Sequence, residues 1–221
     1  MAIKPILFNT EMVRAILDGR KTCTRRLVKP QPKSKLCYKF AGSDSDTWGY
    51  PNRTAHEIWG EEFKLPNDIT EEELSKRWNP PYHTDDILYV RETWCGLPVN
   101  EAGHMRGHTI YYYKADGELR PKGWRGTWHP SIHMPKEAAR IWLKVTDVRV
   151  ERLQEITSEQ ICREGVEVEY PHVLNGEEKR YAFSRLWDST IKKSDLDRYG
   201  WNASPWVWVI EFERCEKPEV V

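Results

Sequence analysis

The apolar run Trp206–Phe212 constrains the fold more than any other stretch of this sequence. Six of its seven residues are aromatic or β-branched, which is typical of a strand. Side chains alternate along a strand, so Trp206 and Trp208 lie on one face and Val207 and Val209 on the other. A strand that is apolar on both faces needs cover on both, and we therefore expect this one to be central in its sheet.

Other segments with regular patterns predict the rest of the framework. Runs rich in β-branched and aromatic residues predict strands at Lys4–Phe8, Ile87–Trp94, Thr109–Tyr113 and Ala139–Leu153, the last with a break near Asp147. Helical spacing and turn residues predict helices at Thr10–Gly19, Thr70–Arg77, Thr157–Gly165 and Lys179–Ile191. Segments 30–83 and 96–138 are irregular and are predicted to be insertions. The pattern predicts one α+β domain over residues 1–221, built on a small β-barrel with flanking helices.

The helix ends carry recognisable signals. Thr10 is expected to cap the first helix, because its hydroxyl accepts from free amides of the first turn. Gly19 is expected to end that helix with a positive φ. Thr157 and Gln160 are spaced as a capping box. The last helix is expected to bury Tyr181, Phe183, Leu186 and Trp187.

Charge and hydropathy limit the possible partners. Lys and Arg total 34 and Asp and Glu total 34, so no global field attracts nucleic acid and any such binding needs a local patch. The mean hydropathy of −0.75 predicts a soluble protein. Neither a membrane-spanning run nor a signal-peptide core is recognised, so we expect no membrane partner.

The number and spacing of the cysteines and histidines predict neither a disulfide nor a metal site. The five cysteines are odd in number, widely spaced and without a CxxC pair, which favours reduced thiols in a cytoplasm. Two histidine pairs are spaced by four residues, as helical zinc ligands are, with Cys95 upstream: His104 with His108, and His129 with His133. Gly103, Gly107 and Pro130 oppose helices there, so neither a metal nor a cofactor is expected.

The nine residues Asp18–Arg26 hold many polar and reactive groups: four cations, two threonines and one thiol. Arg20 and Lys21 follow the negative end of the first helix dipole, which favours cations. If the next residues are extended, Thr22, Thr24 and Arg26 share one side, while Lys21, Cys23 and Arg25 share the other.

These residues carry a resemblance. The run Gly19-Arg20-Lys21-Thr22, with Thr24 and with Arg25 or Arg26, resembles the Gly-x-Lys-x-x-x-Arg motif of ASCH domains, which are small β-barrels of the PUA-like superfamily. Two further blocks resemble the family in the same order, Glu155–Gly165 and Trp206–Phe212. The resemblance covers residues 3–29, 84–95, 139–169 and 205–214, and the whole resembles the longer ASCH-like proteins of phages and prophages.

One ASCH branch resembles the chain in more detail, namely the bacterial amidohydrolases that deacylate N4-acetylcytidine. Their catalytic lysine, threonine and glutamate fall on Lys21, Thr24 and Glu164, which implies a threonine nucleophile with a lysine base. Glu92, on the second predicted strand, is a competing carboxylate. Each residue also has an ordinary interpretation: a phosphate contact for Lys21, a strand residue for Thr24, and a surface carboxylate for Glu164.

Two functions from different classes follow. The first is an amidohydrolase acting on an acylated cytosine-type nucleoside. The second is a non-catalytic protein that binds RNA or a modified base, as PUA-like barrels mostly do. A third interpretation is an accessory phage protein with a vestigial cleft. The residues assigned to substrate or nucleic-acid binding are Arg20, Thr22, Arg25, Arg26, Glu92, Trp94, Trp201 and Trp206. Their ligand is a nucleoside or RNA, and the oligomeric state is left open.

Overall fold

The computed structural model describes residues 1–38, 47–51, 65, 68–99, 108–117, 126–167 and 177–219. The chain divides into two compact units. Unit 1 holds residues 1–22, 84–146 and 212–221, and unit 2 holds residues 23–83 and 147–211. The single domain over residues 1–221 stays a prediction.

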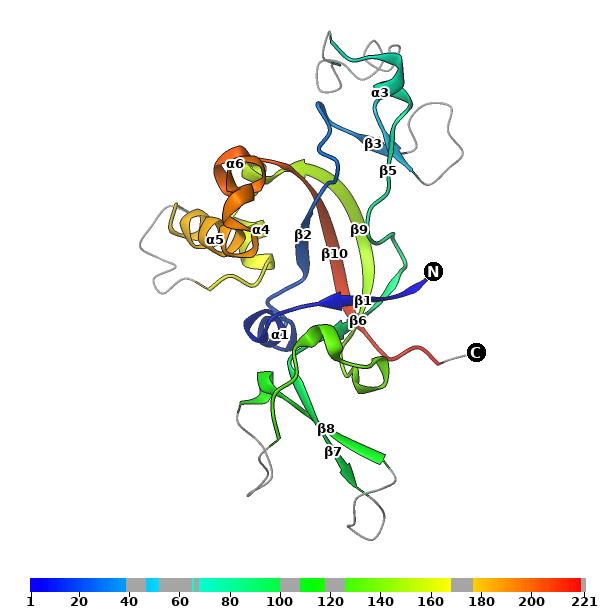
Figure 1. Ribbon diagram of the computed structural model, residues 1–221, viewed down its shortest axis with the longest axis vertical. Coiled ribbons are helices and arrows are strands. Elements are labelled where there is room, and N and C mark those ends of the chain that lie inside the picture. Colours follow the sequence, from blue (N-terminus) through cyan, green and yellow to red (C-terminus); the bar gives the residue numbers. More distant parts are fainter. Residues whose placement is uncertain are drawn as a thin grey trace. The chain divides into compact units, whose positions relative to one another are not determined.

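The principal sheet has the strand order β1-β6-β9-β10-β2 (Figure 1). Its strands are β1 (Ile3–Leu7), β6 (Ile87–Arg91), β9 (Trp142–Arg152), β10 (Trp206–Cys215) and β2 (Cys23–Leu27). β1 and β6 are parallel, whereas β6 with β9 and β10 with β2 are antiparallel. The α+β class and the interior position of β10 are confirmed. The strand order is open, and no pairing among the described strands closes it, so the barrel is not confirmed.

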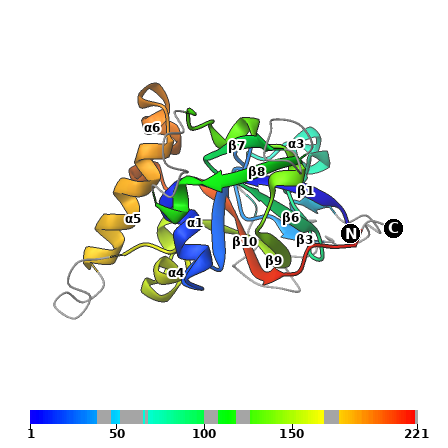
Figure 2. The same cartoon turned by 90° about the horizontal axis from the view of Figure 1, so that it is seen from below.

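Unit 1 contains α1 (Thr10–Leu17) and a hairpin of β7 (Trp94–Val99) with β8 (His108–Tyr113), shown in green in Figure 2. Gly19 has a φ of 74°, as expected for the residue after a helix end. The predicted cap was one residue late, because the Asn9 side chain accepts from the backbone N–H of Met12. The predicted strand Ile87–Trp94 is also too long, since β6 ends at Arg91.

Unit 2 contains a second sheet and most of the helices. β3 (Cys37–Tyr38), β4 (Trp48–Gly49) and β5 (Arg77–Trp78) form an antiparallel sheet within the predicted insertion. The helices are α3 (Glu71–Ser75), α4 (Ser158–Arg163), α5 (Glu177–Thr190) and α6 (Leu196–Tyr199). The predicted break at Asp147 is wrong, because β9 continues through it. Among the described residues, none of the helices has the length and apolar character needed to cross a bilayer.

The core of unit 2 lies between α4, α5 and β10. Its buried members are Leu153, Ile156, Ile161, Phe183, Trp187, Val207 and Val209. On α5, Phe183 and Trp187 are four residues apart and share the buried face. Tyr181 is two residues from Phe183, which places it on the opposite face, and it is 63% exposed. The prediction that Tyr181 is buried was therefore wrong, and Leu186 is only half-buried.

Candidate functional site

Helix α4 places a carboxylate inside unit 2. The capping box predicted at its start is present, with Thr157 and Gln160 each accepting from the other's backbone N–H. Glu164 is the C-terminal cap, and Gly165 follows with a φ of 81°. The short helix therefore ends where the sequence predicts, and it leaves Glu164 only 5% exposed.

Arg25 on β2 is the ionic partner of Glu164. Its Nη1 donates to Glu164 Oε1 at 3.1 Å, and its Nη2 donates to Glu151 Oε2 at 3.2 Å and to Gln160 Oε1 at 3.1 Å. The Arg25 side chain is 1% exposed. A guanidinium that is desolvated and shared by two carboxylates is occupied, so this geometry does not favour the phosphate contact predicted for Arg25.

Thr24 and Arg26 lie on the same side of β2, as the alternation predicts. Arg26 Nη1 donates to Thr24 Oγ1 at 2.9 Å and to the Arg25 carbonyl oxygen at 3.0 Å. Thr24 is 1% exposed. Burial lowers the pKa of the Arg26 guanidinium, and the charges of Tyr82 and Glu164 oppose that shift. A cation that donates to the Thr24 oxygen also favours negative charge developing there.

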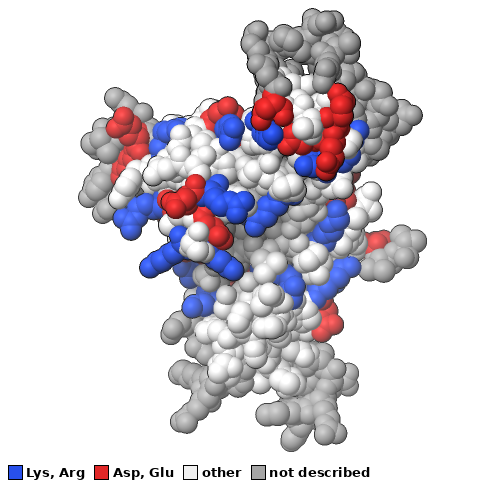
Figure 3. Space-filling view, turned by 45° about the horizontal axis from the view of Figure 1, so that its top comes forward, with Lys and Arg blue, Asp and Glu red and all other residues white. Residues whose placement is uncertain are grey.

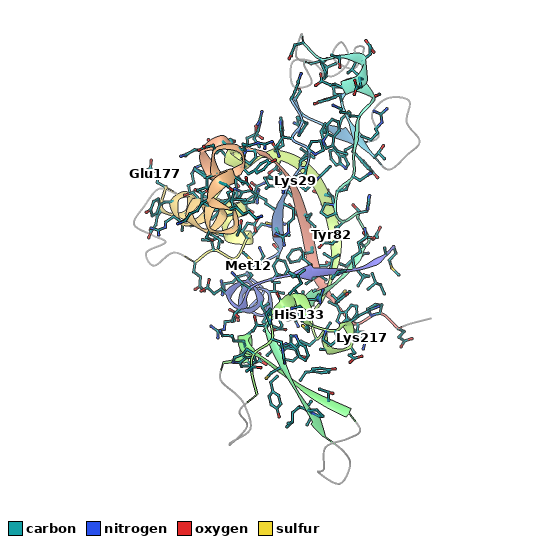
Figure 4. The ribbon with its side chains drawn as sticks, in the orientation of Figure 1. Met12, Lys29, Tyr82, His133, Glu177 and Lys217 are labelled. Carbon is teal, nitrogen blue, oxygen red and sulfur yellow. The ribbon has the colours of Figure 1, made fainter. Side chains whose placement is uncertain are left out.

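A pocket of about 410 Å³ opens beside this cluster within unit 2. We call it the Arg26 pocket, and it is lined by Arg26, Leu27, Lys29, Asn79, Pro81, Tyr82 and Trp208. Figure 4 labels two of them, Lys29 just after β2 and Tyr82 in the segment after β5. Burial raises the pKa of the Tyr82 hydroxyl, although the Arg26 charge opposes this. Two cations, two large aromatic rings and one amide suit a flat, polar, partly anionic ligand.

The sequence did not identify most of this pocket. Asn79, Pro81 and Tyr82 lie in the segment predicted to be an insertion, and no motif marks them. Trp208 was recognised only as a residue of the central strand. One sequence feature could have marked Trp208 as a pocket residue: a tryptophan on a strand next to a basic strand is suited to stacking a base.

Lys21 belongs to unit 1, whereas Thr24 and Glu164 belong to unit 2. Lys21 is 2% exposed, and its Nζ lies 5.4 Å from the centroid of the Phe8 ring. Its backbone N–H donates to the Ala15 carbonyl at the end of α1, which fixes where the side chain begins. The first helix therefore positions a buried lysine amine. The basic turn predicted its place in the chain but not its burial.

The other predicted residues of the basic turn are more exposed. Arg20 forms an ion pair with Asp18 at 2.9 Å, at the surface of unit 1. Thr22 is half-buried, and its carbonyl oxygen accepts from the Phe212 backbone N–H. These contacts are compatible with a phosphate contact for Arg20 and give Thr22 a structural role in the sheet.

Glu92 has a partner of its own within unit 1. Arg140 donates to its two oxygens at 2.9 and 3.0 Å, and Arg140 also pairs with Asp116 at 2.7 Å. Burial raises the pKa of the Glu92 carboxyl, and the Arg140 charge and hydrogen bonds oppose this shift. This arrangement favours a structural ion pair over the substrate contact predicted for Glu92.

The three tryptophans assigned to base stacking already pack against other side chains. The Trp94 ring lies 5.7 Å from that of Tyr111. Trp201 packs edge-on against Phe183 in the unit 2 core, at 6.0 Å. Trp206 is buried, with the Arg152 guanidinium 4.3 Å from its ring centroid. Tyr82, which is half-buried and lines the Arg26 pocket, is better placed for stacking.

The spacing of the histidines is compatible with a zinc site. Within the described residues there is no group of three or more His, Cys, Asp or Glu side chains that could hold a metal ion. His104 lies outside the described residues, as does the side chain of His108.

Replacing Arg25 tests the buried ion pairs. Arg25→Met keeps much of the volume but leaves Glu164 and Glu151 without their shared cation, so unfolding should become easier by about 3–5 kcal/mol. The surface pair supplies the matched control, because Arg20→Met should change stability by less than about 1 kcal/mol. Chemical denaturation of the three proteins measures both values. Equal stabilities for Arg25→Met and wild type would contradict the ion-pair assignment.

No protein-family model matches the chain, and no curated protein matches it either. Among solved structures, it is similar to the ASCH domain from Lactobacillus crispatus JV V101, with 10% sequence identity and a TM-score of 0.36. The match covers 96% of this chain and 79% of that one. At this level of similarity, the match supports no inference about function. Any such inference depends on the residues of the site.

Proposed function

We propose that the protein is an ASCH-type amidohydrolase that binds an acylated cytosine-type nucleoside, such as N4-acetylcytidine, and removes the acyl group. The observation that carries the proposal is the hydrogen bond from Arg26, a residue lining the Arg26 pocket, to the buried hydroxyl of Thr24. It joins a pocket suited to a base to the threonine that the amidohydrolase resemblance marks as nucleophile. The same resemblance supports kinship with phage-borne ASCH-like proteins.

The proposed reaction has two halves, acylation of Thr24 and hydrolysis of the acyl-threonine. Each half forms one bond and breaks one bond at the acyl carbon. Thr24 Oγ1 attacks the acyl carbon, and its proton passes to a lysine base, the role that the amidohydrolase resemblance assigns to Lys21. The carbon–nitrogen bond then breaks, and the amine leaves with a proton. Water attacks the acyl-threonine, which releases the carboxylic acid and restores Thr24. The net reaction consumes one water and yields the nucleoside and the acid.

The neighbours of Thr24 would assist at defined points. Arg26 donates to Thr24 Oγ1 and so stabilises negative charge there during attack. Glu164, held by Arg25, supplies a carboxylate that helps to protonate the leaving amine. In the pocket, Tyr82 would stack the base and Asn79 would recognise its polar edge.

The direct test is release of cytidine from N4-acetylcytidine, followed by the change in ultraviolet absorbance. A panel with acetyl, propionyl and benzoyl groups on the same nitrogen would define the acyl specificity. Cytidine release that requires Thr24 supports the proposal. A wild-type protein that is inert towards the whole panel would remove the hydrolase from first place.

Non-catalytic binding of RNA or a modified base is the second candidate function. It is favoured by the pairing of cations with an aromatic ring in the Arg26 pocket, where Lys29 is exposed and Tyr82 is half-buried. Figure 3 shows Lys and Arg interspersed with Asp and Glu on the viewed face, so a local site rather than a global field would attract RNA.

RNA binding at this pocket should depend on salt. Phosphate contacts release counterions, so the affinity for a single-stranded RNA should fall as salt rises. Replacing Lys29 by glutamine should weaken binding at low salt and reduce the slope of log affinity against log salt by about 1, because one phosphate is no longer neutralised. Fluorescence anisotropy with a labelled strand measures the slope. An unchanged slope in Lys29→Gln would exclude this phosphate contact.

A further inference from the structure

Unit 2 has a second pocket, of about 510 Å³, which the proposed hydrolysis does not use. We call it the Tyr38 pocket, and it is lined by Lys35, Leu36, Cys37, Tyr38, Trp48, Arg149, Val150 and Glu151. Its composition repeats that of the Arg26 pocket: aromatic rings, cations and a polar edge. Tyr38 is 47% exposed, which is unusual for a ring that packs against a tryptophan and suits contact with a ligand.

The two pockets share an aromatic wall. Trp48 lines the Tyr38 pocket and Trp208 lines the Arg26 pocket, and their rings meet edge to face with centroids 5.4 Å apart. On the other side of Trp48, the Tyr38 ring lies 5.4 Å away. Tyr38 and Trp48 are direct cross-strand partners, so they lie on one face of the small sheet. The buried Trp48 ring supports the exposed Tyr38 ring from behind, and Tyr38 offers a surface on which one base of a single strand can stack.

The backbone between the pockets carries cations and is firmly held. Lys29 lines the Arg26 pocket and Lys35 lines the Tyr38 pocket, so segment 29–35 runs from one to the other. Gln31 anchors it by donating to the Val28 and Trp206 carbonyl oxygens, at 2.7 and 2.9 Å. Trp78 adds a bond to the Pro30 carbonyl oxygen at 2.7 Å. A fixed segment with a lysine at each end is suited to phosphates that link two nucleotides.

The polar groups of the two sites are also joined. Arg25 contacts Glu164, the carboxylate of the proposed catalytic cluster, and Glu151, which lines the Tyr38 pocket. Arg149 in turn donates to Glu151 at 2.6 Å. One ion-pair network therefore joins a wall of the Tyr38 pocket to the carboxylate of the proposed catalytic cluster.

We propose that the Tyr38 pocket is a second nucleotide site, formed by the predicted insertion, and that the protein acts on acylated cytidine within single-stranded RNA. This inference rests on the proposed deacylation. The modified base occupies the Arg26 pocket, its neighbour stacks on Tyr38 and Trp48, and Lys29 and Lys35 face the linking phosphates. The insertion thereby selects a strand over a free nucleoside.

The test compares deacylation of N4-acetylcytidine with that of a five-nucleotide RNA strand carrying one such residue. In wild type, kcat/KM for the strand should exceed that for the nucleoside by about five-fold or more, since stacking of one base supplies at least that factor. Tyr38→Leu and Lys35→Gln should bring the ratio close to one. Tyr181→Leu and Lys193→Gln, at exposed sites on unit 2, are the matched controls and should keep the wild-type ratio. A wild-type ratio near one, or a ratio that Tyr38→Leu leaves unchanged, would overturn the second site.

Binding measurements separate this inference from the proposed activity. Thr24→Val protein is titrated into a labelled single strand and followed by anisotropy, with and without the Tyr38→Leu change. Binding that depends on Tyr38, combined with a wild type that deacylates nothing, retains the second site and rejects the hydrolase. Nucleoside deacylation without any gain from the strand retains the hydrolase and rejects the second site.

Discussion

Replacing Thr24 by valine should lower the rate of deacylation by at least about 10³-fold, because the change removes the attacking oxygen. Valine is nearly the same shape as threonine, so the buried site on β2 should stay filled and the protein folded. The measurement is kcat for cytidine release, together with a thermal melt that confirms the fold. Full activity in Thr24→Val would show that Thr24 is not the nucleophile.

Two further variants and a control sharpen this result. Thr24→Ser keeps a hydroxyl and should retain part of the activity. Lys21→Arg keeps the positive charge but does not readily give up a proton, so it should fail as Thr24→Val does. Thr146→Val changes an exposed threonine on β9 and should behave as wild type. Loss of activity in the control would mean that the assay reports folding instead of chemistry.

Replacing Val209 by aspartate should prevent folding. Val209 is fully buried on β10, opposite Arg25 in the β2–β10 pairing and within the core that α4 and α5 cover. The nearest cation, Arg25, is already held by Glu164 and Glu151, so a third carboxylate there either stays charged with poor compensation or must be protonated, and both are costly. The expected loss is on the order of 5 kcal/mol or more, comparable with the whole stability of a typical domain. Soluble yield and the cooperativity of the thermal melt measure it.

An exposed position on the same strand provides the control. Arg214→Asp introduces the same carboxylate near the end of β10, where solvent reaches it, and should leave the melting midpoint within a few degrees of wild type. A soluble Val209→Asp protein with an unchanged midpoint would contradict the central position of β10.

Local signals account for the features that the sequence predicted well. The end of α1 at Gly19, the capping box of α4 and the burial of both faces of β10 each depend on residues a few positions apart. The errors are local as well. Asn9 caps α1 in place of Thr10, one position earlier, and β9 carries Asp147 through without a break, because pairing with neighbouring strands overrides the weak strand propensity of one aspartate.

The sequence by itself therefore determined the α+β class, the interior strand and the presentation of a basic turn at the end of a helix. Only the tertiary structure decided the roles of the side chains in that turn. Arg25 became the partner of Glu164, 139 residues away, and Arg26 came to line the Arg26 pocket with Tyr82 and Trp208. The physical reason is that burial and ion pairing are properties of the whole fold. Spacing along the chain places a guanidinium on a strand face, but only packing decides whether it meets a carboxylate, a hydroxyl or solvent.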